Sequence, residues 1–154
     1  AGPMATRLCI PEGTQLPRPI VEYYYKDSKL QSPMVAEEHI VAFGWANQQD
    51  LDDIVALSLR VNDFLSGVMM GVGIRLADFR IEVGRIWEGD FMRLIVADEI
   101  SPDSCRLWDM RQPERPDGTI PDPLPMADVY TELARRLRVM PSNGTHAMKP
   151  PLIN

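Results

Sequence analysis

The chain has 154 residues, of which 45% are hydrophobic and 25% are charged, so we expect one domain with one sizeable core rather than a disordered or fibrous protein. Its formal net charge of −6 argues against general affinity for nucleic acid or anionic membranes, which require an excess of Lys and Arg. Two distant cysteines and two histidines predict neither a disulfide framework nor a Cys/His metal site, and they favour a reducing, cytoplasmic location.

The N-terminal part of the chain carries few strong signals. Residues 1–3 precede Met4 and are either native sequence or the remainder of a cleaved tag. Prolines and a glycine predict a loop over residues 11–19, and the β-branched and aromatic residues 20–26 predict a strand.

A long amphipathic helix is predicted next. Asn47 is suited to be its N-cap, with Asp50 three residues later, and apolar residues then recur at helical spacing as far as Gly71 and Gly73. The apolar residues 68–74 are too few to cross a bilayer, so we expect no membrane span.

Residues 74–83 and 91–98 are predicted to form a β-hairpin with a short connection. The first strand has one apolar and one charged face, whereas the second is apolar on both faces until Asp98, so hydrophobicity leaves the register open. If opposed residue numbers add to an even number, Asp78, Glu82 and Asp98 share a face, and an odd sum separates them. We predict the even register.

An irregular, proline-rich connection is predicted over residues 111–125, and apolar spacing over residues 126–137 predicts an amphipathic helix. Three arginines lie near its negative C-terminal end: Arg135, Arg136 and Arg138. We expect a single α+β domain over residues 1–139, with a mostly antiparallel sheet packed by helices, and an extended tail over residues 140–154.

The stretch VADEISPDSCRLWD, residues 96–109, places acidic residues and one arginine beside an apolar run. Carboxylates that converge at a strand end suit Mg²⁺, although an alternating charged face is also typical of the solvated side of an antiparallel sheet. Arg106 is similarly open to two interpretations. It forms a local ion pair with Asp103 or Asp109, or it holds a phosphate or carboxylate with two hydrogen bonds.

Several motifs resemble the SAICAR synthetase (phosphoribosylaminoimidazole-succinocarboxamide synthase) family. They are, in the family's order, RLCIPEGTQLPRPIVEYYYK, PMVAEEH, AFGW, RVNDFL, DFRIEVG and ADEISPDSCRLWD. The resemblance is close over residues 1–111 and looser over residues 127–139. It implies the fold of the family's larger, C-terminal lobe and an enzyme that joins carboxyaminoimidazole ribotide to L-aspartate with ATP and Mg²⁺.

The resemblance also implies roles for six residues. Glu82 and Asp98 match the carboxylates that hold Mg²⁺, and Arg106 matches the arginine that contacts the ribotide. The other three match positions in the family's catalytic motifs: Asp78, Arg80 and Asp103. Phosphorylation of the ribotide carboxylate supplies a leaving group, and Mg²⁺ offsets the charge of the transferring phosphoryl group.

Several positions depart from the family pattern. Arg80 replaces a lysine and Val83 a phenylalanine, Pro3 stands at a substrate-contacting serine, and Ser32 stands at an aspartate. Cys9 replaces a glycine and would be strained wherever the backbone needs a positive φ.

The family also has an N-terminal lobe of roughly 80 to 100 residues, the size of a small domain, which carries much of the ATP site. We expect no counterpart of that lobe here, which leaves two hypotheses. The chain is a SAICAR synthetase that is inactive alone, or it is a non-catalytic homologue retained as a binding or structural subunit of a larger assembly. In either case, an exposed apolar face predicts a homo-oligomer or a hetero-complex.

Overall fold

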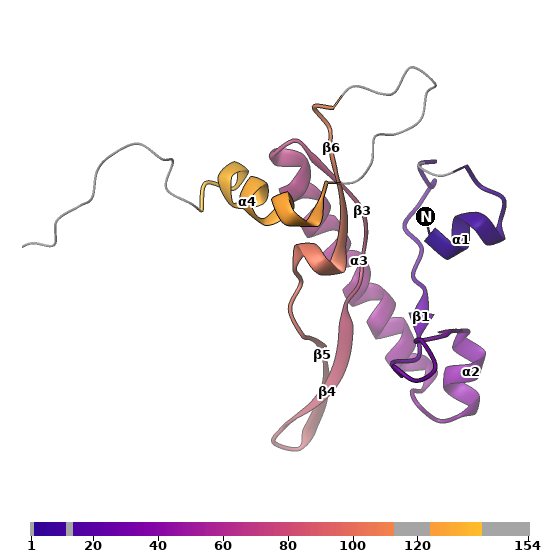
Figure 1. Cartoon of the computed structure of the whole chain (residues 1–154). Helices are drawn as coiled ribbons and strands as arrows, with labels where there is room; N and C mark the ends of the chain where they lie inside the picture. The colour runs from indigo at the N-terminus through magenta and orange to yellow at the C-terminus, as the bar shows by residue number, and fades with distance from the viewer. Residues whose placement is uncertain (1, 12–13, 113–123, 140–154) are drawn as a thin grey trace, which may run out of the picture.

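The computed structural model of the chain describes residues 2–11, 14–112 and 124–139 (Figure 1). Most of the predicted connection over residues 111–125 and the whole predicted tail lie outside the described residues. The elements follow in this order: α1 (Gly2–Arg7), β1 (Tyr23–Tyr24), β2 (Met34–Val35), α2 (Glu37–Ala42), α3 (Gln48–Gly71), β3 (Ile74–Phe79), β4 (Glu82–Glu88), β5 (Phe91–Ala97), the 3₁₀ turn η1 (Pro102–Ser104), β6 (Cys105–Asp109) and α4 (Met126–Arg136).

The fold is mixed α+β, as predicted, but its strands form small sheets. Within the described residues, three two-stranded antiparallel sheets pair β1 with β2, β3 with β6, and β4 with β5. The strand predicted over residues 20–26 is present only as Tyr23–Tyr24. The residues that the structure describes therefore form small antiparallel sheets and not the single, mostly antiparallel sheet that was predicted.

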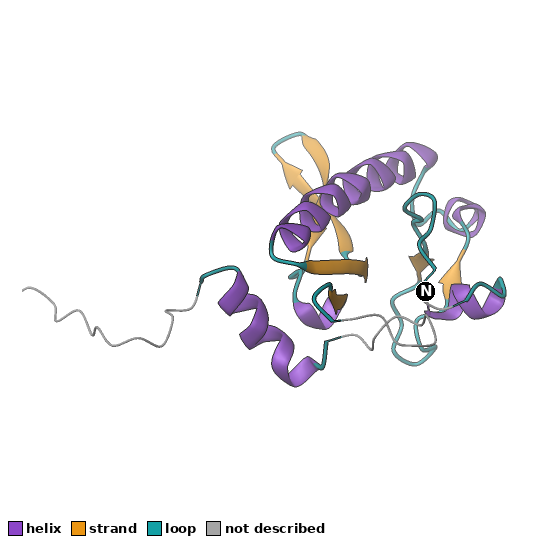
Figure 2. Cartoon of the chain, turned by 90° about the horizontal axis from the view of Figure 1, so that it is seen from above, coloured by secondary structure: helices purple, strands orange, loops and turns teal. Residues whose placement is uncertain are grey.

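The long helix α3 begins where the sequence predicts. The Asn47 side chain accepts a hydrogen bond from the Asp50 backbone N–H at 2.8 Å, and the Asp50 carboxylate accepts one from the Asn47 N–H at 3.2 Å. This reciprocal arrangement satisfies two of the backbone donors that every helix start leaves unpaired. The helix then packs against β3 and β5, across which it lies in Figure 2.

Helix α3 is also long and apolar enough, by length and composition, to cross a membrane. It has 24 residues and a mean hydropathy of 1.3 over its most apolar window, none of which is buried in the structure. The expectation of no membrane span stays a prediction, because length and composition alone do not place a helix in a bilayer. Arg60 and Asp63 lie in the helix, and charges near a bilayer centre are costly, which favours a helix in contact with protein and water.

The predicted first hairpin strand is two strands. β3 ends at Phe79 and β4 begins at Glu82, and between them the Arg80 backbone N–H donates to the Ser104 carbonyl at 2.8 Å. β3 pairs with β6, which the sequence analysis did not identify as a strand. Only β4 and β5 form the predicted hairpin.

The hairpin register is odd, which contradicts the predicted even register. Glu82 lies opposite Ala97, and Glu88 lies opposite Phe91. A two-residue loop that begins with Gly89, at φ 64, joins the strands, and a two-residue loop necessarily gives an odd sum. Asp98 follows the end of β5 at φ 70, so strand alternation no longer determines its direction.

The core lies where α4 covers the β3–β6 pair (Figure 1). Its buried residues come from β3, β6 and α4: Ile74, Leu107, Val129 and Leu133. Met69 and Val72 at the C-terminal end of α3 pack against this cluster. Elsewhere, Cys9 has φ 53, so the cysteine occupies the left-handed conformation that a glycine would adopt without strain.

Candidate functional site

Glu82 pairs with the ammonium group of Lys26, and the charge of that ammonium also acts on Asp98. Lys26 Nζ is 2.5 Å from Glu82 Oε1 and 2.6 Å from Glu82 Oε2. The hydrogen bonds to Glu82 raise the pKa of Lys26, and the charges of Glu82 and Asp98 act in the same direction. One cation therefore pairs with Glu82 and acts electrostatically on Asp98, although the strand register is odd.

The surroundings of Asp98 favour its ionised form. The side chain of Glu99 and its backbone N–H, which is 3.0 Å from Asp98 Oδ1, lower the pKa of Asp98 through hydrogen bonds, and Lys26 lowers it further. Asp98 is thus ionised at neutral pH. Sequence reasoning missed Lys26, because a single lysine at the end of an aromatic strand does not indicate which of many carboxylates it will meet.

Arg106 pairs with Asp78. The two residues are opposed in the β3–β6 register, and Arg106 Nη2 lies 3.4 Å from Asp78 Oδ2. The predicted local ion pair of Arg106 therefore forms with Asp78, and not with Asp103 or Asp109. The reason is the pairing of β3 with β6, which places Asp78 directly across from Arg106.

Asp103 and Arg80 are positioned separately from these pairs. Asp103 lies in η1, and its Oδ2 accepts a 2.7 Å hydrogen bond from the Tyr130 hydroxyl of α4, which raises the pKa of Tyr130. Arg80 is exposed at the break between β3 and β4. The structure thus pairs Asp78 with Arg106, and it pairs Glu82 with Lys26. The catalytic roles of all these residues stay predictions.

A three-carboxylate metal cluster is not formed. Nowhere in the described ranges do three or more His, Cys, Asp or Glu side chains gather closely enough to hold a metal ion. The expected convergence of Asp78 with Glu82 and Asp98 is therefore wrong, because Asp78 belongs to the β3–β6 sheet and the other two to the hairpin. Two carboxylates remain, and Mg²⁺ is commonly held by one or two carboxylates plus substrate phosphate and water.

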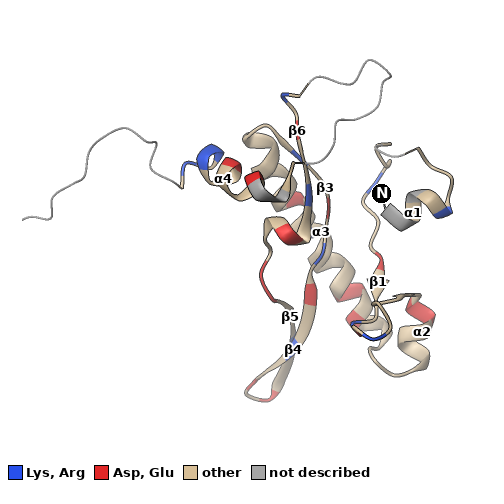
Figure 3. Ribbon diagram, in the orientation of Figure 1, with Lys and Arg blue, Asp and Glu red and all other residues tan. Residues whose placement is uncertain are grey.

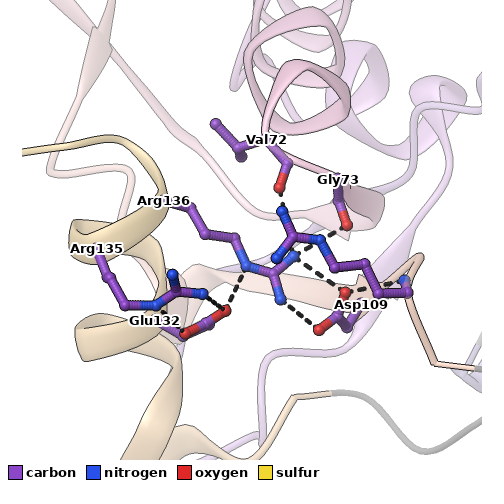
Figure 4. Close-up of polar contacts among 7 residues, drawn as sticks. Val72, Gly73, Asp109, Glu132, Arg135 and Arg136 are labelled. Carbon is purple, nitrogen blue, oxygen red and sulfur yellow. Dashed lines mark hydrogen bonds and ion pairs between the residues drawn. The ribbon is translucent and has the colours of Figure 1, made fainter.

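A dense polar network surrounds Arg136 (Figure 4). Its Nη1 donates to the Gly73 carbonyl at 3.1 Å, the Val72 carbonyl at 3.3 Å and Asp109 Oδ1 at 3.0 Å. Its Nη2 donates to Asp109, and its Nε donates to Glu132. The guanidinium of Arg136 holds the pKa of Asp109 below its usual range.

Two pockets occur away from the predicted site residues. The first has a volume of about 510 Å³ and lies at the turn after α3, beside Arg136. The second, of about 360 Å³, is apolar and is lined by α3 residues and Ile100. None of the six predicted site residues lines either pocket.

Comparisons with known proteins agree on one family. The family model described as SAICAR synthetase matches residues 1–121. A phosphoribosylaminoimidazole-succinocarboxamide synthase of Roseobacter denitrificans is 65% identical over the whole chain, and the homologous protein of Acidiphilium cryptum is 58% identical over 98% of it. The chain spans 62% and 60% of the length of these two relatives.

Solved structures give the same result. The synthase of Ehrlichia chaffeensis is similar with a TM-score of 0.77 and 38% identity, covering 92% of this chain and 61% of that one. A SAICAR synthetase in complex with ADP is similar with a TM-score of 0.69 and 34% identity, covering 90% of this chain and 56% of that one. By sequence and by fold, the chain belongs to the SAICAR synthetase family.

Proposed function

We propose that this chain supplies the magnesium- and ribotide-binding part of a SAICAR synthetase, corresponding to the family's larger, C-terminal lobe. The reaction would be the ATP-dependent joining of carboxyaminoimidazole ribotide to L-aspartate in cytoplasmic purine biosynthesis. The whole-protein activity is a proposal because the chain spans 62% of its Roseobacter relative. It is supported by family membership and by the ADP complex of a similar synthetase.

The observation that carries the proposal is the position of Lys26. Its ammonium contacts both carboxylate oxygens of Glu82 and acts electrostatically on Asp98. Two carboxylates that share one exchangeable cation form a donor set that fits Mg²⁺ once substrate oxygens complete it. When bound, Mg²⁺ would offset charge on the transferring phosphoryl group.

The remaining residues would position the anionic substrate. Arg106 offers a planar guanidinium that can hold a phosphate or carboxylate with two hydrogen bonds. Asp78 lies 3.4 Å from Arg106 and so orients it while keeping one side of its guanidinium occupied. Asp103 accepts a hydrogen bond from Tyr130 near the start of β6, and Arg80 is exposed at the break between β3 and β4. We assign both residues to the edge of the site that faces the substrate.

A binding experiment tests this assignment. We expect calorimetric binding of the ribotide to the chain to require Mg²⁺, and we expect Glu82→Gln to abolish that requirement together with most of the binding. Glu88→Gln is the matched control, because Glu88 lies in the same hairpin in an exposed pair with Arg93 at 2.6 Å. Equal binding by both variants and the wild type would contradict the proposed metal site.

A turnover assay tests the ligase activity itself. Incubated with ATP, L-aspartate, the ribotide and Mg²⁺, the 154-residue polypeptide alone is expected to form no succinocarboxamide product. It spans 62% of its Roseobacter relative, and we assign much of the ATP site to the part of the family's proteins that it does not span. Turnover at about 1 per second or faster, an ordinary enzyme rate, would show that the chain is sufficient.

The alternative, a non-catalytic subunit, is favoured by one observation. The apolar pocket on α3 includes Phe64, whose surface is 70% exposed, and such surfaces commonly contact a partner. We therefore propose that the chain forms a homo-oligomer or a hetero-complex through this face. Light scattering that shows a monomer at high concentration would count against self-association, and substrate binding that depends on Glu82 would count against a purely structural role.

A further inference from the structure

A pocket rich in arginine lies at the C-terminal end of α3. It encloses about 510 Å³, within the range of small-molecule sites. Two glycines and four arginines line most of it: Gly71, Gly73, Arg111, Arg135, Arg136 and Arg138. We call it the arginine pocket. Figure 3 shows the basic residues gathered at the end of α4, next to the turn that follows α3.

Positive charge in the arginine pocket exceeds the negative charge that contacts it. In the described part of the chain, the carboxylates that pair with these arginines are Asp109 and Glu132. Both bind Arg136, and Glu132 also binds Arg135 at 2.6 Å. Two carboxylates therefore serve four guanidinium groups. Among these described residues, the side chains of Arg111 and Arg138 lie in no ion pair.

Arg111 and Arg136 converge on one point. A Cβ built on Gly73 would lie 3.5 Å from Arg111 Nε and 3.7 Å from Arg136 Nη1. Like charges brought this close repel each other, and Asp109, which pairs with Arg136 and feels the charge of Arg111, offsets part of this repulsion. Arg136 already donates to Asp109, Glu132 and the Val72 and Gly73 carbonyls, so Arg111 has more donors left to offer.

The C-terminal end of α3 does not repel an anion in this pocket. A helix C-terminus ordinarily carries partial negative charge on its unpaired carbonyls, which would repel an anion. Arg136 donates to the Val72 and Gly73 carbonyls and so compensates for part of that charge. At Gly71, an added Cβ would meet nothing within 4 Å, so the floor of the pocket is open to a ligand.

We propose that the arginine pocket binds a phosphate-bearing small molecule, at a place separate from the proposed metal and ribotide site. Guanidinium groups recognise phosphate through paired hydrogen bonds, and a dianion matches the excess of positive charge. None of the proposed metal and ribotide contacts lines the pocket, and Arg106 lies three residues before Asp109 in β6, roughly 10 Å along the strand from the carboxylate that holds Arg136. The pocket is therefore a second anion site.

The test uses the full 154-residue chain with inorganic phosphate as the probe. Titration followed by amide NMR is expected to shift the Gly71 and Gly73 signals. In calorimetry, the double variant Arg111→Gln/Arg138→Gln is expected to weaken phosphate binding about tenfold or more, the order expected for losing a hydrogen bond between charged groups. Arg136 is left in place because its contacts hold the fold.

Two controls separate the possible outcomes. Arg60→Gln/Arg93→Gln removes the same charge from exposed positions away from the pocket and is expected to leave binding unchanged. Arg106→Gln removes the predicted ribotide contact, and the Gly71 and Gly73 shifts should persist in it. Unshifted glycine signals in the wild type, or equal weakening by both double variants, would overturn the proposal. Neither result would bear on the proposed ligase, whose test is the Glu82 variant.

Discussion

Two clusters of charged residues in this molecule differ in their exposure. Around Arg136, the side chains of Arg136 and Asp109 are 4% and 13% exposed, and backbone carbonyls complete the hydrogen bonding. Around Lys26, the side chains of Lys26 and Glu82 are 76% and 43% exposed. Residues that hold α4 to the rest of the molecule are thus largely buried and have several hydrogen-bond partners, whereas those of the proposed active site are exposed and can exchange their partners.

The difference has a physical basis. A charge removed from water costs free energy that only well-placed partners offset, so breaking a buried pair leaves an uncompensated charge inside the protein. An exposed pair exchanges its contact for water with little change in free energy. The pair between Arg85 and Asp50, with side chains 38% and 11% exposed, lies between these extremes. Substitutions at the three pairs should therefore have graded effects.

Arg136→Met is expected to have the largest effect on stability. It removes the partner of Asp109 and the donors to the Val72 and Gly73 carbonyls, so we expect the free energy of unfolding to fall by about 3–5 kcal/mol. Urea denaturation followed by circular dichroism measures this. Arg135→Met is the matched control, since Arg135 is 60% exposed and shares Glu132 with Arg136. A variant as stable as the control would show that the buried cluster contributes nothing.

Arg85→Met is expected to have an intermediate effect. Arg85 Nη2 lies 2.7 Å from Asp50 Oδ2, and its Nη groups also donate to the Trp45 carbonyl. Loss of these contacts should lower the free energy of unfolding by about 1–2 kcal/mol, because the mostly buried Asp50 carboxylate loses its charged partner. The same urea series measures it, with Arg60→Met, a single exposed arginine of α3, as the control. A loss as large as that of Arg136→Met would contradict the graded order.

Glu132→Gln is expected to change how the stability of the protein depends on pH. Hydrogen bonds from Arg135 and Arg136 lower the pKa of Glu132 from 4.5 to about 2. A carboxyl group whose pKa is lower in the folded than in the unfolded protein stabilises the fold at any pH above its unfolded-state pKa. This contribution is lost as the pH falls through the folded-state pKa. Unfolding midpoints of the wild type should therefore decrease more steeply between pH 4.5 and about pH 2 than those of Glu132→Gln. Parallel curves would argue that Glu132 titrates normally.

Local sequence signals predicted the elements that local physics determines. Asn47 and Asp50 identified the start of α3, and the apolar spacing of residues 126–137 identified α4, because caps and periodicity depend only on neighbours in the chain. The β4–β5 hairpin was found for the same reason, since its strands are separated by two residues.

Long-range contacts were not predictable in the same way. β6 pairs with β3 across more than 25 residues, and its motif had been interpreted only for its chemistry. The predicted register was wrong because a hydrophobic pattern shows neither the break after Phe79 nor the short loop that begins at Gly89. Lys26 meets Glu82 across 56 positions of sequence, and only the fold shows this contact.

Lys26→Met is expected to have the smallest effect on stability and a distinct effect on binding. The pair with Glu82 is exposed, so the urea midpoint should stay within experimental error of the wild type. Mg²⁺ affinity, measured by calorimetry, should increase several-fold, because the ammonium no longer competes for the carboxylates of Glu82 and Asp98. Lys29→Met, an exposed lysine three residues later, is the control and should leave Mg²⁺ binding unchanged. Weaker Mg²⁺ binding by Lys26→Met would mean that the lysine assists the metal site instead of occupying it.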